Sequence, residues 1–194
     1  ESNTESFHWY ISELNKTLVG QKNNYDYEVS VIVPAYNVGE YIDQCIESLA
    51  IQSLEKIEVI VVDDGTPDDS GVRADQWAEK FPGRVKVVHK VNGGCASARN
   101  AGIQAAKGRY IGFVDGDDWV APRMYEDLYR SAILESSDIA QCGFLEAYTT
   151  GEMINFPLNV NVSRIDLLSE RPTMWRRIYS SAMLRAKSIT DGRA

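Results

Sequence analysis

Short runs of β-branched and apolar residues alternate along the chain with segments in which apolar residues recur at helical spacing. The apolar runs predict strands at residues 29–33, 57–62, 85–89, 110–114 and 139–145. The segments with helical spacing predict helices at residues 41–49, 70–80, 96–107 and 122–135. Alternation of strand and helix at this spacing predicts βαβ units, and therefore a mainly parallel sheet with helices on both faces.

The two ends of the chain follow other patterns. Phe7, Ile11, Leu14 and Leu18 recur at helical spacing and predict a short amphipathic helix, followed by a polar linker that ends near residue 27. The apolar stripe of this helix must be buried. It can pack on its own domain, form a homodimer contact through residues 7–19, or lie on a membrane surface as a peripheral anchor. Farther on, residues 148–163 are polar and predict a loop.

Composition narrows the function classes. A length of 194 residues suits one domain with an appendage, and a net charge of −8 without a run of Lys and Arg argues against a nucleic-acid surface. No apolar run approaches the roughly 20 residues that span a bilayer, so no transmembrane segment is expected. The chain has three cysteines, an odd number, and they are widely spaced: Cys45, Cys95 and Cys142. This pattern favours packing roles in a reducing compartment. A cytoplasmic location, or the inner face of a membrane, is the expectation.

The run from Tyr110 to Val114 leads directly into Asp115, Gly116, Asp117 and Asp118. Three carboxylates at the end of a buried strand repel one another unless water or a cation screens them. A hard divalent ion such as Mg²⁺ or Mn²⁺ prefers oxygen ligands of this kind. The alternative is a solvated turn, since Asp and Gly are common turn residues.

Other polar loops follow the remaining predicted strands. Ligands of parallel α/β sheets bind outside the carboxyl ends of the strands, so these loops should meet at one edge. The loops contain Pro34, Ala35, Tyr36 and Asn37 after the first strand, Asp63, Asp64 and Gly65 after the second, and Asn92, Gly93 and Gly94 after the third. No GxGxxG follows the first strand and no GxxxxGK[ST] occurs, so a nucleotide would be bound in another way.

Each loop residue has a functional and a structural interpretation. The ring of Tyr36 can stack on a base or pack at the rim, and Asp64 can accept a hydrogen bond from a base or ribose or form a turn with Asp63. Gly93 and Gly94, just before a predicted helix that contains Arg99, suit an anion. In the alternative, they form a turn and Arg99 forms a structural ion pair.

Four stretches, in this order, resemble the inverting glycosyltransferases of family 2. They are VSVIVPAYN at 29–37, VVDDGTPDDS at 61–70, NGGCASARNAGI at 92–103 and GRYIGFVDGDDWV at 108–120, and the likeness covers about residues 29–135. The resemblance implies the GT-A fold, a Rossmann-like three-layer α/β/α arrangement with a mainly parallel central sheet. It also implies a division into the helix and linker at 1–27 and a glycosyltransferase domain at 28–194. Residues 28–120 of that domain would bind the nucleotide sugar, and 121–194 the acceptor.

The resemblance also assigns roles to residues. Pro34, Ala35 and Tyr36 match the loop that holds the base, and Asp64 matches the residue that contacts the nucleoside. Asp115 and Asp117 match the DxD motif. Asp115 would lie near the ribose or the metal, and Asp117 would be a ligand of the Mg²⁺ or Mn²⁺ ion that bridges the donor diphosphate. Arg99 matches a residue with a role in diphosphate binding or in the scaffold. Residues expected at the donor or acceptor site are Asn37, Asp118, Trp119 and Trp175, with Trp175 and Tyr179 either stacking on a sugar or packing in the core.

The implied activity is metal-dependent transfer of a sugar, with inversion, from a nucleotide donor, expected to be UDP-linked, to a glycan or lipid-linked acceptor. The family's catalytic base is a carboxylate of an ED-type motif that follows these segments. Asp191 lacks the preceding Glu, so the base is left unassigned. A non-catalytic GT-A module that binds nucleotide sugars is the first alternative. A phosphatase of the haloacid dehalogenase type is the second, although its DxD follows the first strand of its core.

Overall fold

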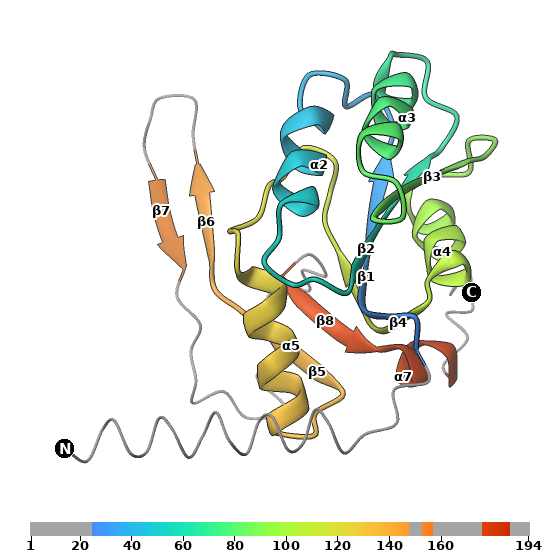
Figure 1. The fold of residues 1–194 in the computed structure, drawn as a ribbon. Helices are drawn as coiled ribbons and strands as arrows, with labels where there is room; N and C mark the ends of the chain where they lie inside the picture. Colours follow the sequence, from blue (N-terminus) through green and yellow to red (C-terminus); the bar gives the residue numbers. More distant parts are fainter. Residues whose placement is uncertain (1–24, 148–152, 157–175, 187–194) are drawn as a thin grey trace, which may run out of the picture.

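A six-stranded sheet in the order β3-β2-β1-β4-β8-β5 forms the centre of the computed structural model, which describes residues 25–147, 153–156 and 176–186 (Figure 1). Strands β1 to β4 run parallel, whereas β8 runs antiparallel to both of its neighbours. The strands are β1 (Tyr27–Ala35), β2 (Ile57–Asp63), β3 (Val85–His89), β4 (Gly108–Phe113), β5 (Ile139–Gln141) and β8 (Arg177–Ser180). The mainly parallel sheet predicted from the sequence is confirmed.

Helices cover both faces of this sheet. One face packs against α2 (Ile42–Ala50), α3 (Ser70–Lys80) and α5 (Met124–Leu134), and the other against α4 (Cys95–Ala105) and α7 (Ser181–Ala186). Within β1, Val31 and Val33 belong to the first core cluster and Ile32 to the second. Central parallel strands are buried on both faces, which explains why their sequences are continuously apolar.

Two glycines allow close packing on the two faces. A Cβ atom at Gly102 of α4 would lie 2.4 Å from Cγ2 of Ile32, and one at Gly112 of β4 would lie 2.7 Å from Cε1 of Tyr125. Both distances are far inside van der Waals contact. The helices α4 and α5 can therefore approach the sheet this closely only where glycine is present.

The structure corrects two expectations for the chain after α5. Residues 139–145 do not form one strand, because β5 belongs to the central sheet and β6 (Phe144–Ala147) pairs antiparallel with β7 (Met153–Phe156) in a separate sheet. The presence of β7 also shows that residues 148–163 are not loop throughout. The pairing of β5 with β8 joins segments far apart in the sequence, which a local pattern cannot reveal.

The expected helices agree with the observed ones to within about two residues at each end, the usual uncertainty of helix boundaries. The amphipathic helix predicted near the N-terminus lies outside the described residues. Across the described ranges, no helix is both long and apolar enough to cross a membrane.

A buried carboxylate joins three strands at the end of the sheet opposite to the polar loops. Glu58 is 2% exposed and accepts hydrogen bonds from the hydroxyl of Ser30 at 2.5 Å and from the backbone N–H of Lys107 at 2.6 Å. Nζ of Lys86 lies 2.7 Å from the other carboxylate oxygen and also donates to the carbonyl of Ala105 at 3.0 Å. Burial of a carboxylate is tolerable here because each of its oxygens is paired.

We predict that Glu58→Ala lowers the free energy of unfolding by about 3 kcal/mol, because it leaves the ammonium of Lys86, the buried hydroxyl of Ser30 and the N–H of Lys107 without their acceptor. Urea unfolding followed by circular dichroism measures this change. Glu55→Ala, at an exposed position three residues earlier, is the control and should cost less than about 0.5 kcal/mol. Equal losses in the two variants would show that the buried network contributes nothing specific.

Candidate functional site

The four polar loops after β1, β2, β3 and β4 lie together at the carboxyl edge of the sheet, as predicted. Backbone hydrogen bonds join their first residues: the N–H of Asp64 donates to the carbonyl of Ala35 at 3.0 Å, and the N–H of Lys90 to that of Asp63 at 2.9 Å. On the other side of β1, the N–H of Val114 donates to the carbonyl of Ile32 at 3.1 Å. The parallel register thus brings to one site four loops that lie between about residue 34 and residue 118 of the chain.

Asp64 is buried at this edge and holds the loop after β3. Its carboxylate pairs with Nζ of Lys90 and accepts hydrogen bonds from the backbone N–H groups of Gly93 at 3.0 Å and Gly94 at 2.7 Å. Burial would raise the pKa of Asp64, but the hydrogen bonds from Lys90, Gly93 and Gly94 outweigh it and lower the pKa below its usual 3.8. The residue is therefore an ionised anchor.

This arrangement changes the interpretation of the glycines before α4. The sequence allowed two interpretations of Gly93 and Gly94: a binding edge for an anion, or a turn. In the structure both groups donate to Asp64, a carboxylate of the protein itself. The N-terminus of α4 faces a negative charge, which the helix dipole favours. That charge belongs to Asp64, in the loop after β2.

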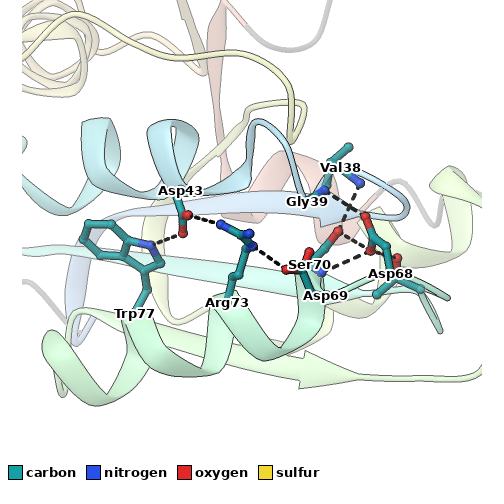
Figure 2. A network of polar contacts seen from close by, with 9 residues as sticks. Val38, Gly39, Asp43, Asp68, Asp69, Ser70, Arg73 and Trp77 are labelled. Carbon is teal, nitrogen blue, oxygen red and sulfur yellow. Dashed lines mark hydrogen bonds and ion pairs between the residues drawn. The ribbon is translucent and has the colours of Figure 1, made fainter.

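Another acidic residue, Asp68, joins the loop after β2 to the loop after β1 (Figure 2). It accepts hydrogen bonds from the hydroxyls of Thr66 and Ser70, both at 2.5 Å, and from the backbone N–H of Gly39 at 2.8 Å. Burial opposes ionisation, but these hydrogen bonds keep the pKa of Asp68 well below 3.8. Asp68 was not among the site residues predicted from the sequence. An Asp two residues before a helix-starting Ser is the available signal, because Asx turns use this spacing.

Figure 2 also shows how the two helices that follow these loops are joined. The carboxylate of Asp43 in α2 accepts a hydrogen bond from the indole N–H of Trp77 at 2.8 Å and pairs with the guanidinium of Arg73 at 2.6 Å. Arg73 also pairs with Asp69 at 2.8 Å, one turn earlier in α3. Since these groups are half-exposed, they contribute orientation more than stability.

At the end of β4, Asp115 pairs with Arg99 of α4, whose Nη2 lies 2.6 Å from Oδ1. Their side chains are 36% and 27% exposed, so the pair is partly shielded from water. Nε of Arg99 is buried and has no hydrogen-bond partner within the described part of the chain. The structural ion pair that we weighed for Arg99 is present, and it orients the first carboxylate of the acidic cluster.

The next acidic side chains point into solvent. Asp117 and Asp118 are exposed, and neither carboxylate has a hydrogen-bond or ion-pair partner among the residues that the structure describes. Loss of hydration beside the protein, followed by the charges of Asp117 and Asp115, raises the pKa of Asp118 to about 6. Trp119 is 54% exposed beside them. Within the described residues, no partner therefore neutralises the charges of Asp117 and Asp118.

The loop after β1 presents both backbone and side chains to the same edge. Tyr36 is 50% exposed, and Asn37 adopts a positive φ of 56° that directs its N–H to the hydroxyl of Thr66 at 2.8 Å. The side chain of Ala35 is fully buried, and Pro34 is partly buried. A ligand at this loop can therefore contact the ring of Tyr36, whereas Ala35 has no exposed surface.

Of the remaining candidate residues, Tyr179 lies in the core. The ring of Tyr179 packs edge-to-face on Phe113, with centroids 6.2 Å apart, in the core cluster beneath α4 and α7. Tyr179 thus follows the core-packing interpretation. Trp175 and Asp191 lie outside the described residues. The cysteines in the described ranges are free, and Cys45 is buried as expected, but Cys95 is exposed at the start of α4.

A divalent cation fits the acidic cluster only in part. Asp115 and Asp117 offer hard oxygen donors, and the carboxylate of Asp117 is open to solvent. Within the described ranges, however, no group of three or more His, Cys, Asp or Glu side chains is arranged to hold a metal ion. Two carboxylates suit a Mg²⁺ or Mn²⁺ ion that takes its other ligands from water and from an anionic substrate.

Comparison with known proteins decides the family. The sequence profile described as Glycosyl transferase family 2 matches residues 30–191, most of the chain. The chain belongs to glycosyltransferase family 2. A family match of this extent leaves the phosphatase alternative without support.

Two Bacillus subtilis relatives illustrate the match of this family 2 chain. The uncharacterized glycosyltransferase EpsJ is 53% identical over 116 residues, which are 60% of this chain and 33% of EpsJ. The putative glycosyltransferase EpsH is 34% identical over 172 residues, 84% of this chain and 49% of EpsH. The chain therefore spans about one third to one half of the length of these relatives.

Among solved structures, Staphylococcus aureus TarS in complex with UDP superposes with a TM-score of 0.67 and 26% identity. The match covers 82% of this chain and 48% of the TarS chain. A structure of TarS with UDP-GlcNAc matches with a TM-score of 0.65 and 28% identity, over 82% of this chain and 47% of that one. These likenesses confirm the GT-A fold of the family 2 chain.

One titratable side chain lies near the site without belonging to it. Nδ1 of His89, the last residue of β3, lies 2.9 Å from Asp63, and its Nε2 lies 3.0 Å from Asp75 of α3. The hydrogen bonds to Asp63 and then to Asp75 raise the pKa of His89 above 6.5. The imidazolium form is the one that can donate to both carboxylates.

We predict that His89→Gln costs stability only at acidic to neutral pH. A raised pKa in the folded state means that the contribution is fully present below pH 6.5 and disappears as the pH rises through that raised value. The loss should stay below about 1 kcal/mol, because half of the imidazole is exposed. Urea unfolding at about pH 6 and about pH 9 tests this. Gln76→Ala, at an exposed position on α3 without a titrating group, should cost the same at both pH values.

Proposed function

We propose that this chain forms the donor-binding part of a metal-dependent, inverting glycosyltransferase that takes its sugar from a nucleotide sugar. One observation carries the proposal. The open carboxylate of Asp117 and the oriented carboxylate of Asp115 share the carboxyl edge of a GT-A sheet with the exposed ring of Tyr36. Acidic side chains make sense beside an anionic diphosphate only with a cation between them.

UDP is the proposed nucleotide. Support comes from the TarS complexes with UDP and UDP-GlcNAc, which match more than four fifths of this chain. In this chain Tyr36 has a ring face open for stacking on a base. Asp64 already pairs with Lys90, Gly93 and Gly94, so we propose that it shapes the nucleoside pocket by holding their loop in place.

Asp117 and Asp115 are the proposed ligands of Mg²⁺ or Mn²⁺. When bound there, the ion would supply a Lewis acid for the charge that develops on the leaving diphosphate. Arg99 keeps the carboxylate of Asp115 oriented, which favours a scaffold role for Arg99 over direct diphosphate contact. Trp119 and Asp118, which are exposed beside Asp117, together with Asn37, would border the donor sugar.

We propose a glycan or lipid-linked acceptor, bound by the part of the chain after residue 120, with the action of the protein in the cytoplasm or at the inner face of a membrane. We further propose a role in polysaccharide biosynthesis, which the family resemblance implies. Trp175 and the proposed dimer contact through residues 7–19 lie outside the described residues, so they remain predictions from the sequence.

We predict that Asp117→Asn lowers the affinity for UDP in the presence of Mn²⁺ by about tenfold or more, because it removes an anionic metal ligand while preserving shape. Isothermal titration calorimetry with and without Mn²⁺ measures the loss. Asp127→Asn is the matched control, because Asp127 is an exposed carboxylate on α5 that pairs with Arg123 at 3.1 Å. Unchanged Mn²⁺-dependent affinity in Asp117→Asn would remove the metal assignment.

Two further measurements separate the remaining alternatives. A thermal-shift screen of UDP, GDP, CDP and dTDP with and without Mn²⁺ identifies the nucleotide, since a ligand that binds the folded state raises its stability. Hydrolysis of the corresponding nucleotide sugar distinguishes an enzyme from a module that only binds. Binding without any turnover by the full-length protein would favour the non-catalytic GT-A module.

A further inference from the structure

The loop between β4 and α5, which contains the acidic cluster, lies along one face of α2. The thiol of Cys45 donates to the carbonyl of Asp115 at 3.6 Å, and the hydroxyl of Ser48 accepts from the N–H of Val120 at 3.2 Å. Burial raises the pKa of the Cys45 thiol, which therefore stays protonated as a donor. These residues are three apart in α2, so both face the loop.

Gln52 completes this row of contacts just after α2 ends. The side chain is 4% exposed, which is unusual for an uncharged polar residue unless it is hydrogen-bonded. Its amide nitrogen donates to the carbonyls of Ser48 at 3.0 Å and Ala121 at 2.7 Å. Its amide oxygen accepts from the N–H of Tyr125 at 3.2 Å. A single buried amide thus binds two helices and the loop between β4 and α5.

Two of these contacts satisfy groups that helix geometry leaves without a partner. The carbonyl of Ser48 lies in the last turn of α2, and the N–H of Tyr125 lies in the first turn of α5, where intrahelical partners are missing. Arg123, at the N-cap of α5, makes no capping hydrogen bond with its side chain. Gln52 therefore supplies the cap that the local sequence of α5 lacks.

The adjacent Ser53 reinforces the same junction. Its N–H donates to the carbonyl of Pro122 at 2.9 Å, and its hydroxyl donates to Glu126 at 2.6 Å. The hydrogen bond from Ser53 lowers the pKa of Glu126, which keeps negative charge in the first turn of α5. The C-terminal end of the β4–α5 loop is consequently fixed by the residues that follow α2.

The middle of the loop has no comparable support from its own side chains. Among the described residues, the side chains of Asp117, Asp118 and Trp119 have no hydrogen-bond or ion-pair partner. Their directions therefore depend on the backbone path between Asp115 and Tyr125. That path is set at one end by Arg99 and Cys45, and at the other by Gln52 together with Ser48 and Ser53.

We propose that Gln52 is a positioning residue for the acidic cluster: its amide holds the β4–α5 loop in the path that presents Asp117 and Trp119 to the donor. The part of this inference that concerns affinity for the donor rests on the proposed function. The effect of Gln52 on the loop itself is independent of that function and is measurable without ligand.

The test compares Gln52→Met with the wild-type chain. Methionine keeps the length and apolar stem of the side chain and removes all three hydrogen bonds. We expect amides of residues 115–125 to exchange hydrogen about tenfold faster, because the local opening of this loop becomes easier. We also expect affinity for UDP with Mn²⁺ to fall by about five- to tenfold, and this loss should shrink in an Asp117→Asn background, since the two residues act through one site.

Ser30→Ala is the control for a general loss of stability. Ser30 is equally buried and polar, with its hydroxyl bonded to Glu58 at 2.5 Å and to the N–H of Gly108 at 2.7 Å, but it lies at the opposite end of the sheet. It should leave loop exchange and UDP affinity near wild type. If Gln52→Met does not fold, Gln52→Glu, which keeps the acceptor for Tyr125 and loses the amide donors, takes its place.

The outcomes are distinct. Faster loop exchange with weaker, Asp117-dependent binding supports the positioning role. Loop exchange in the Gln52 variant that equals that of Ser30→Ala overturns it. If the wild-type chain binds no UDP with Mn²⁺, the proposed function fails, whereas the exchange measurement still decides whether Gln52 holds the loop.

Discussion

The parallel register of β1 with β2 and β4 is the constraint on which the candidate site depends. Ala35 lies opposite Asp63, and Ile32 opposite Phe113, so the loops that follow these strands leave the sheet at one level. Parallel strands require crossovers, and the helices that form them cover both faces. The polar loops then have only the edge of the sheet to occupy, and their backbone groups need partners there.

Carboxylates of the chain accept hydrogen bonds from many of the backbone N–H groups in the polar loops. The acidic residues at this edge are therefore of two kinds. Asp64 and Asp68 are enclosed by hydrogen-bond donors and act as internal anions that tie one loop to another. Asp117 and Asp118 remain open to solvent at the same edge. An acidic chain can therefore present a site for an anionic ligand with a cation, because part of its negative charge is already neutralised locally.

Local sequence patterns were sufficient for the first four strands and for the helices between them. Buried parallel strands are continuously apolar, and α2 carries a clear apolar stripe, so both signals are contained within short windows. Local sequence patterns were insufficient for the chain after α5. Whether Ile139 and Phe144 belong to one strand or two depends on β8 and β7, and these pairings join segments that lie far apart along the chain. Strand pairing of this kind depends on tertiary context.

The sequence alone determined the family resemblance, the order of elements from 29 to 135 and the position of the acidic cluster at a strand end. Motif spacing and hydrophobic period carry that information. Only the tertiary structure decided which polar groups satisfy one another: Asp64 takes the N–H groups of Gly93 and Gly94, Arg99 takes Asp115, and Gln52 bridges α2 to α5. Hydrogen-bond partners are chosen by distance and direction in space, and a residue's own neighbours in sequence do not specify them.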